Sequence, residues 1–126
     1  MRFMTVWTPN EPSPPTPELM ADMGVYMEEV ATAGVLVDGG AWLPVTQGAR
    51  LTSSGGKVTV IDGPFTEAKE VIAGWAIIDV PSKEEAIRWS TRFVELHAKH
   101  GIDGTSEVRP FVEEGDFDPN AGAAQG

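Results

Sequence analysis

The sequence predicts an α+β sandwich, in which two helices cover one face of an antiparallel sheet. Three observations support this prediction. Two segments repeat apolar residues every three or four positions, several short runs rich in β-favouring residues are bounded by glycine or proline, and the two kinds of segment alternate along the chain. With 126 residues, the chain suits one domain with one core. The expected order is strand, helix, strand, hairpin, strand, helix, strand.

The first strand is expected over residues 2–8, where aromatic and β-branched side chains dominate. Five prolines between positions 9 and 17 then predict a stiff, extended loop. Thr16, Pro17 and Glu18 predict a helix start, because they supply an N-cap, a proline suited to the first position and an acid favoured by the helix dipole. The apolar stripe of this helix comprises Leu19, Met23, Tyr26, Met27 and Val30.

Gly34 is expected to close the first helix, since glycine turns left-handed without strain. A second strand then runs from residue 35 toward Trp42 and Leu43. Residues 49–53 and 57–62 predict a hairpin that turns at Ser54-Gly55-Gly56.

Residues 71–80 form the longest apolar run, and we expect a strand there that is buried on both faces. Ser82 and Glu85 form a capping box, which predicts the start of a second helix. The apolar stripe of this helix comprises Ala86, Trp89, Phe93 and Leu96. Pro110 places the last strand, residues 107–112, at a sheet edge.

Both faces of the predicted sheet carry apolar side chains. Phe3 and Trp7 lie on one side of their strand, and Met4 and Val6 lie on the other. Two helices cover only one face, so the second face needs another partner. We therefore expect a homodimer.

The net charge of −10 excludes nucleic acid as a direct partner, because DNA and RNA binding depends on Lys and Arg. The absence of cysteine excludes disulfides and thiolate chemistry. The sequence has no signal peptide and no apolar stretch that approaches a membrane span, so we expect a cytoplasmic protein with no membrane partner.

Several segments of this sequence together resemble the YCII-related or "DGPF domain" family. The main one is Asp62-Gly63-Pro64-Phe65-Thr66-Glu67-Ala68-Lys69-Glu70, and it is followed by Gly74-Trp75, residues 77–81 and Glu107-Val108-Arg109-Pro110. The resemblance covers about residues 1–112, and residues 113–126 are an acidic, Gly/Ala-rich tail. It implies a ferredoxin-like fold that dimerises into an α+β barrel. Proteins with the same barrel include isomerases, lyases and cofactor-free monooxygenases. Many family members are encoded near extracytoplasmic-function sigma factors.

The signature segment is the first candidate site. Asp62 and Glu67 are candidate catalytic acids or bases, while Phe65 and Lys69 are candidates for holding a substrate. The alternative is structural: Asp62 caps the turn, for which Asp before Gly is a strong signal, and the other charges form a solvated network.

Three further residues are candidates for substrate binding. Trp7 and Trp75 can line a pocket for an aromatic substrate, although aromatic residues are more often part of a core. Arg109 can clamp a carboxylate or pair structurally with Asp62 or Glu67. The YCII branch is thought to use a His–Asp pair, but this chain has no histidine before His97, so that pair is not evident.

His97 and His100 share a helix face, but two histidines are too few for a usual metal site, and we expect no metal and no cofactor. Two functions remain open. The first is an enzyme, such as a cofactor-free lyase or isomerase, that holds a small apolar or aromatic acid in the barrel between the sheets of a dimer. The second is a non-catalytic regulatory module linked to a sigma factor.

Overall fold

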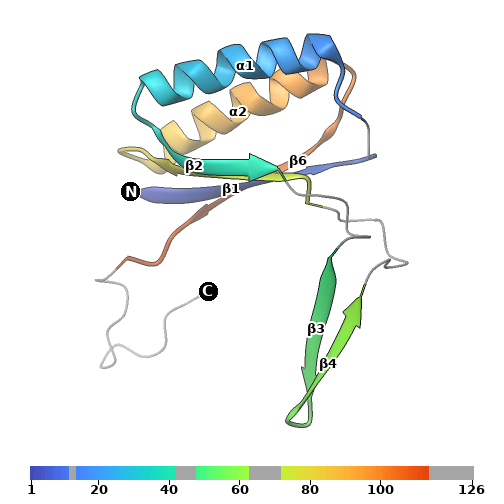
Figure 1. Cartoon of the computed structure of the whole chain (residues 1–126). Coiled ribbons are helices and arrows are strands. Elements are labelled where there is room, and N and C mark those ends of the chain that lie inside the picture. The colour runs from blue at the N-terminus through green and yellow to red at the C-terminus, as the bar shows by residue number, and fades with distance from the viewer. Residues whose placement is uncertain (12–13, 42–47, 63–71, 114–126) are drawn as a thin grey trace.

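The computed structural model describes residues 1–11, 14–41, 48–62 and 72–113. Within these ranges, helices and strands follow the predicted order (Figure 1). The elements are β1 (Arg2–Pro9), α1 (Pro17–Thr32), β2 (Leu36–Ala41), β3 (Ala49–Ser54), β4 (Lys57–Asp62), β5 (Gly74–Asp79), α2 (Lys83–Lys99) and β6 (Gly104–Pro110).

The main sheet has the strand order β2-β5-β1-β6, and all its neighbouring strands are antiparallel. Both helices lie on one face of this sheet (Figure 1). Each helix connects two strands that are not neighbours, which is the ferredoxin-like arrangement of a split β-α-β unit. The α+β prediction is therefore confirmed.

The helix ends form where the capping residues predict them. The Leu19 amide donates to Thr16 Oγ1 at 3.1 Å, and the Glu85 amide donates to Ser82 Oγ at 3.2 Å. Pro17 occupies the first turn of α1. Gly34, just beyond α1, has a φ of 71°, a left-handed conformation that glycine adopts without strain.

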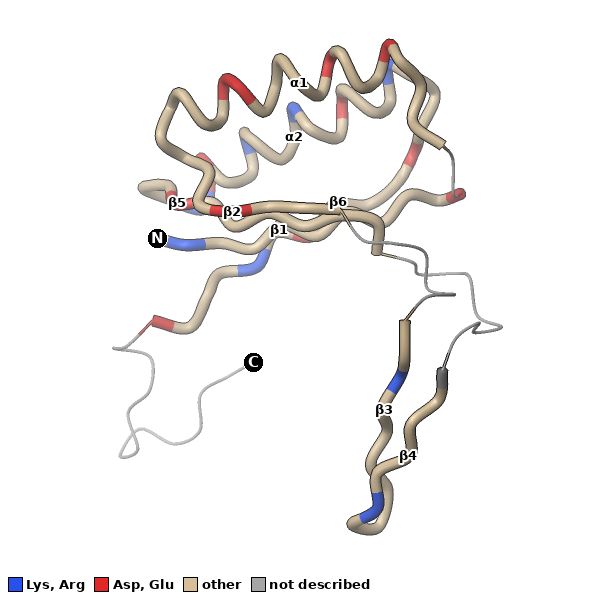
Figure 2. The backbone as a smooth tube through the Cα atoms, viewed as in Figure 1, with Lys and Arg blue, Asp and Glu red and all other residues tan. Residues whose placement is uncertain are grey.

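The core lies between the helices and the sheet. Phe3 of β1 and Ile78 of β5 are direct cross-strand neighbours, and both are buried. They pack with Val30 of α1 and Ala86 of α2, which are also buried. Along α1 the charged residues are all acidic, whereas α2 carries charges of both signs (Figure 2). Ion pairs between Arg92 and Glu29 and between Lys99 and Asp22 join α2 to α1.

The opposite face of the sheet has no cover within the described residues. Met4 pairs with Ile77 and Val6 pairs with Trp75, so these four side chains share that face. All four are partly exposed. In the single chain the strand predicted over residues 71–80 is buried on its helix-facing side, and burial of its second face stays a prediction that requires a partner. The strand is also shorter than predicted, beginning at Gly74.

The hairpin β3–β4 forms a separate two-stranded sheet and extends away from the sandwich (Figure 1). The two turn residues, Gly55 and Gly56, both have positive φ, as the type I′ turn of a two-residue hairpin loop requires. Leu51 and Val60 are cross-strand neighbours, and both are exposed, as is Val58 on the same face.

The edge position predicted for the last strand is confirmed, although β6 begins at Gly104, three residues earlier than expected. Trp42 and Leu43, predicted in the second strand, lie outside the described residues, as does the tail from residue 114. Neither helix in the described part of the chain is long and apolar enough to cross a membrane.

Candidate functional site

A cavity of about 440 Å³ lies between the helix layer and the sheet. Its floor is made by small residues on the helix-facing side of the strands. Gly39 pairs with Ala76, Ala41 pairs with Gly74, and Thr5 is the second neighbour of Ala76. Because these residues have short side chains or none, they leave part of the space between the sheet and the helices unfilled. The hollow thus follows from the composition of the floor.

Apolar and aromatic side chains form the walls of the cavity. From α1 come Leu19, Met23, Tyr26, Met27 and Val30, which are the residues of the predicted stripe. Trp7 contributes from β1 and Phe93 from α2. A cavity of this size, mostly apolar with few polar groups, is typical of a small-molecule site.

Three rings form the centre of the aromatic wall. The centroid of Trp7 lies 5.4 Å from that of Phe93 in an edge-to-face arrangement, and 4.7 Å from that of His97. Phe93 and His97 are 4.4 Å apart. Contacts of this kind hold the rings in defined orientations and so shape the cavity before any ligand enters.

Gly104 fixes the place of the Trp7 ring. A Cβ atom built on Gly104 would lie 2.6 Å from Cη2 of Trp7 and 2.6 Å from the carbonyl oxygen of Thr8. Only glycine allows the indole to pack this closely on β6. A side chain at this position would force a shift in the indole or in the backbone of β1.

Tyr26 brings a hydroxyl near the cavity, but that hydroxyl is already used. It donates to the backbone oxygen of Trp89 at 2.8 Å, in a buried setting. Burial raises the pKa of Tyr26 to about 12, because the charged phenolate would be poorly solvated there. Tyr26 therefore stays protonated and orients α1 on α2, and it is a poor acid or base.

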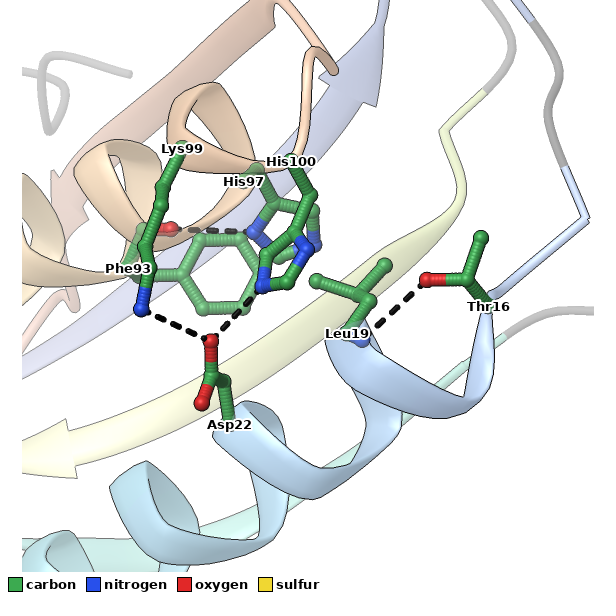
Figure 3. Close-up of polar contacts among 7 residues, drawn as sticks. All are labelled: Thr16, Leu19, Asp22, Phe93, His97, Lys99 and His100. Carbon is green, nitrogen blue, oxygen red and sulfur yellow. Dashed lines mark hydrogen bonds and ion pairs between the residues drawn. The ribbon is translucent and has the colours of Figure 1, made fainter.

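His97 and Ser90 are the buried polar residues of the cavity wall. His97 is 7% exposed, and its Nδ1 lies 2.9 Å from the backbone oxygen of Phe93 (Figure 3). A carbonyl oxygen only accepts, so Nδ1 carries the proton in this contact. The hydroxyl of Ser90 has no hydrogen-bond partner among the described residues.

A second histidine lies beside the cavity wall and has a different role. His100 Nε2 donates to the carboxylate of Asp22 at 2.7 Å, and Lys99 Nζ approaches the same oxygen at 3.3 Å (Figure 3). These two contacts, led by His100, lower the pKa of Asp22 below its usual range. The cluster joins the end of α2 to α1, and none of its three residues lines the cavity.

A His–Asp pair therefore exists, formed by residues 78 positions apart in the sequence. The expectation that no such pair is evident rests on local sequence, in which this contact leaves no sign. The described residues hold no group of three or more potential metal ligands.

The site residues predicted from the sequence do not all lie at the cavity. Trp7 and Trp75 are both among the residues that line the cavity, but the indole of Trp75 lies beside Gly40 of β2, on the uncovered face of the sheet. Arg109 does not line it. This side chain is 73% exposed, and its Nε lies 4.0 Å from the carboxylate of Glu107 on the same strand. The partner in this contact is neither Asp62 nor Glu67, so the structural pairing expected for Arg109 stays a prediction.

Asp62 is the last residue of β4 and pairs with Ala49 through the backbone ladder. Phe65, Glu67 and Lys69 lie outside the described residues. The proposed catalytic and substrate-binding roles of these four residues remain predictions.

The cavity also lies on the other side of the sheet from the one expected. We expected a ligand between the sheets of a dimer, next to the uncovered face, whereas this cavity lies beneath the helices of one chain. The site between the sheets stays a prediction. Ser90 is a buried polar wall residue that the sequence analysis missed. A serine within an apolar helical stripe, between Ala86 and Phe93, is the signal that could have identified it.

Comparison with known proteins places the chain in a family. A solved structure of 5-chloro-2-hydroxyhydroquinone dehydrochlorinase (TftG) from Burkholderia phenoliruptrix AC1100, in complex with 2,5-dihydroxybenzoquinone, is similar with a TM-score of 0.46. The alignment covers 94% of this chain and all of that one, at 15% identity. That similarity is too low to support an argument about ligand or reaction.

An uncharacterised protein, R00369, from Rhizobium meliloti (strain 1021) is 33% identical over 94 residues. These residues are 75% of this chain and 73% of the relative. A sequence model of the YCII-related domain matches residues 1–113. The chain therefore belongs to the YCII-related domain family.

Proposed function

We propose that this protein binds a small aromatic or apolar acid in the cavity beneath its helices. The observation that carries the proposal is the cavity itself. It has about 440 Å³ of space, a floor of small residues, aromatic walls and a buried imidazole. A flat ring fits between the Trp7 and Phe93 walls and the α1 stripe, while His97 offers a partner for one polar group.

The proposed activity is that of a cofactor-free lyase or isomerase, which needs a group that moves a proton. His97 is the described residue in the wall best suited to this role. Asp62 and Glu67 of the signature segment remain candidates for a second acid or base.

Binding is tested with two small acids, 4-nitrobenzoate and 4-nitrophenol, by isothermal titration. We expect at least one of them to bind to the unmodified protein. Ala76→Leu fills the floor of the cavity and should weaken that binding about tenfold or more, because the side chain occupies the space of the ring. Val6→Leu, on the uncovered face of the sheet, is the matched control and should leave binding unchanged.

Two results would count against the proposal. The first is that neither acid binds at millimolar concentration. The second is that Ala76→Leu, shown by its melting curve to be folded, binds as well as the unmodified protein. Either result would favour the alternative, a non-catalytic interaction module such as a partner of a sigma factor.

We also propose that the protein is a homodimer. The uncovered face of the sheet carries Met4, Val6, Trp75 and Ile77, all partly exposed. The hairpin exposes Leu51, Val58 and Val60, at 64%, 66% and 59% of their surface. A two-stranded hairpin is marginal in water by itself, so a partner surface is expected to stabilise it. A second copy offers both apolar surfaces at once.

A further inference from the structure

We infer that the ligand enters the cavity as a neutral phenol and transfers its hydroxyl proton to Nε2 of His97. This inference deepens the proposed function and rests on it. It names the substrate class and the residue that receives the proton.

The tautomer of His97 is the first step of the argument. Nδ1 lies 2.9 Å from the carbonyl oxygen of Phe93, one helical turn earlier, and must donate to it (Figure 3). A neutral imidazole carries one proton, so Nε2 is then an acceptor with a lone pair. Nε2 has no hydrogen-bond partner among the described residues. The helix backbone therefore presents His97 to the cavity as a proton acceptor.

The rigidity of the ring is the second step. His97 is 7% exposed, and its ring stacks against Trp7 and Phe93, with centroids 4.7 and 4.4 Å away. A ring held on two sides and hydrogen-bonded at Nδ1 has little freedom to flip. The acceptor atom thus keeps one position, as general base catalysis requires.

The charge around the cavity is the third step, and it selects phenols over carboxylic acids. No described residue of the cavity wall is a lysine or an arginine, and the charged residue that lines it is Glu11. The other charged groups near His97 pair with one another, since Asp22 accepts from His100 and Lys99. A carboxylate would enter already ionised, with no cation to offset the loss of its hydration. A phenol enters neutral.

The transfer itself is balanced. The phenolic O–H bond breaks, a new N–H bond forms at Nε2, and the products are a phenolate and an imidazolium held side by side. No oxidant, reductant or metal takes part.

The experiment uses 4-nitrophenol, whose absorption spectrum shifts to longer wavelength when it ionises. At a pH where the compound is mostly neutral in buffer, we expect the bound form to show the phenolate spectrum. His97→Gln should abolish this shift and weaken 4-nitrophenol about tenfold or more, because an acceptor that forms a charge-assisted hydrogen bond is lost. His100→Gln, in the neighbouring pair outside the cavity wall, should keep the shift.

The methyl ether 4-nitroanisole separates the role of His97 from that of the cavity. It has the same ring but no acidic proton, so its affinity should be similar for the unmodified protein and for His97→Gln. Binding of 4-nitroanisole or 4-nitrobenzoate, together with 4-nitrophenol bound without a spectral shift, would overturn the inference and leave the proposed function intact. Absence of binding by all three compounds would overturn both.

A measurement on the unmodified protein avoids dependence on the variant. In ¹⁵N spectra of histidine, Nε2 of His97 should move to the position of a protonated nitrogen when 4-nitrophenol is added, and should not move with 4-nitroanisole. An unchanged Nε2 signal at saturating 4-nitrophenol would contradict the proton transfer, whether or not His97→Gln folds.

Discussion

Both faces of the main sheet carry apolar side chains, but the residues that the structure describes cover only one of them. Phe3 and Met4 are adjacent in β1, yet Phe3 is 1% exposed under the helices, while Met4 lies on the uncovered face. The two faces also differ in the size of their residues. The covered face has small residues such as Ala76 and Gly74 at one end, and the uncovered face presents Trp75 and Ile77.

This difference shows that the size of the residues on an apolar face affects whether that face forms a cavity or a contact surface. Where a covered face carries small residues, the helices bridge over them and leave a cavity. Where an uncovered face carries large residues, it offers a broad surface that suits another protein chain. Each prediction below probes one side of that comparison.

Replacing Phe3 should have the largest effect. Phe3→Ala removes the largest fully buried side chain of the described core and should lower the free energy of unfolding by about 3–5 kcal/mol. Met4→Ala, one residue further along the same strand, should cost at least about 1 kcal/mol less, since Met4 is only partly buried in the chain. Both are measured by urea denaturation. Equal losses would mean that the two faces are covered to the same degree in solution.

Gly104→Ala should destabilise the protein by about 1–3 kcal/mol through overpacking. The added methyl group would press on the Trp7 ring and on the backbone of β1. Gly24→Ala is the matched control, because Gly24 lies within α1 and a methyl group there meets no atom within 4 Å. It should stabilise by about 0.5–1 kcal/mol, as alanine favours a helix. Thermal unfolding should thus shift in opposite directions.

Ile77→Lys tests the uncovered face. If the uncovered face is exposed to water, the new lysine should change the free energy of unfolding of the protomer by only about 0.5 kcal/mol. Placed in a dimer interface, it buries an unpaired charge and should convert the dimer into a monomer. We expect sedimentation equilibrium at micromolar concentration to give twice the chain mass for the unmodified protein and the single chain mass for the variant. A monomer in both cases would contradict the homodimer.

The cluster around Asp22 should give the smallest effect, because its carboxylate is exposed to solvent. Its pKa is lowered in the folded state, so the stabilisation is present above the pKa of the unfolded chain, about 3.9, and is lost as the pH falls through the lower folded value. Asp22→Asn should therefore reduce the melting temperature slightly at pH 6 and not at pH 2. A difference that is independent of pH would indicate a packing effect rather than a charge effect.

The sequence was most informative about elements that depend on neighbouring residues. Thr16, Ser82 and Gly34 mark helix ends because capping hydroxyls and left-handed glycines act within one turn. The alternation in β1 shows that two apolar faces exist. The family resemblance, carried by the signature segment and the strands around it, is borne out by the match over residues 1–113.

The candidate site depended on contacts that local sequence does not record. The sequence drew attention to Asp62 and Glu67 of the signature segment and to Arg109 of the last strand, but the cavity is built by α1, α2 and the helix-facing side of the sheet. The sequence shows the spacing between His97 and His100, which suggests a metal ligand. It does not show that His97 packs against Trp7. Likewise, Asp22 and His100 are 78 positions apart, and only the packing of the two helices joins them.

The sequence by itself therefore determined the element order, the helix boundaries and the two apolar faces, since each arises from residue chemistry repeated over a few positions. Only the tertiary structure decided which face the helices cover, where small residues from β1, β2 and β5 coincide to leave a cavity, and which histidine lines it. Those outcomes depend on register and packing between segments that are distant in the chain, where one shift of register would exchange the two faces of a strand.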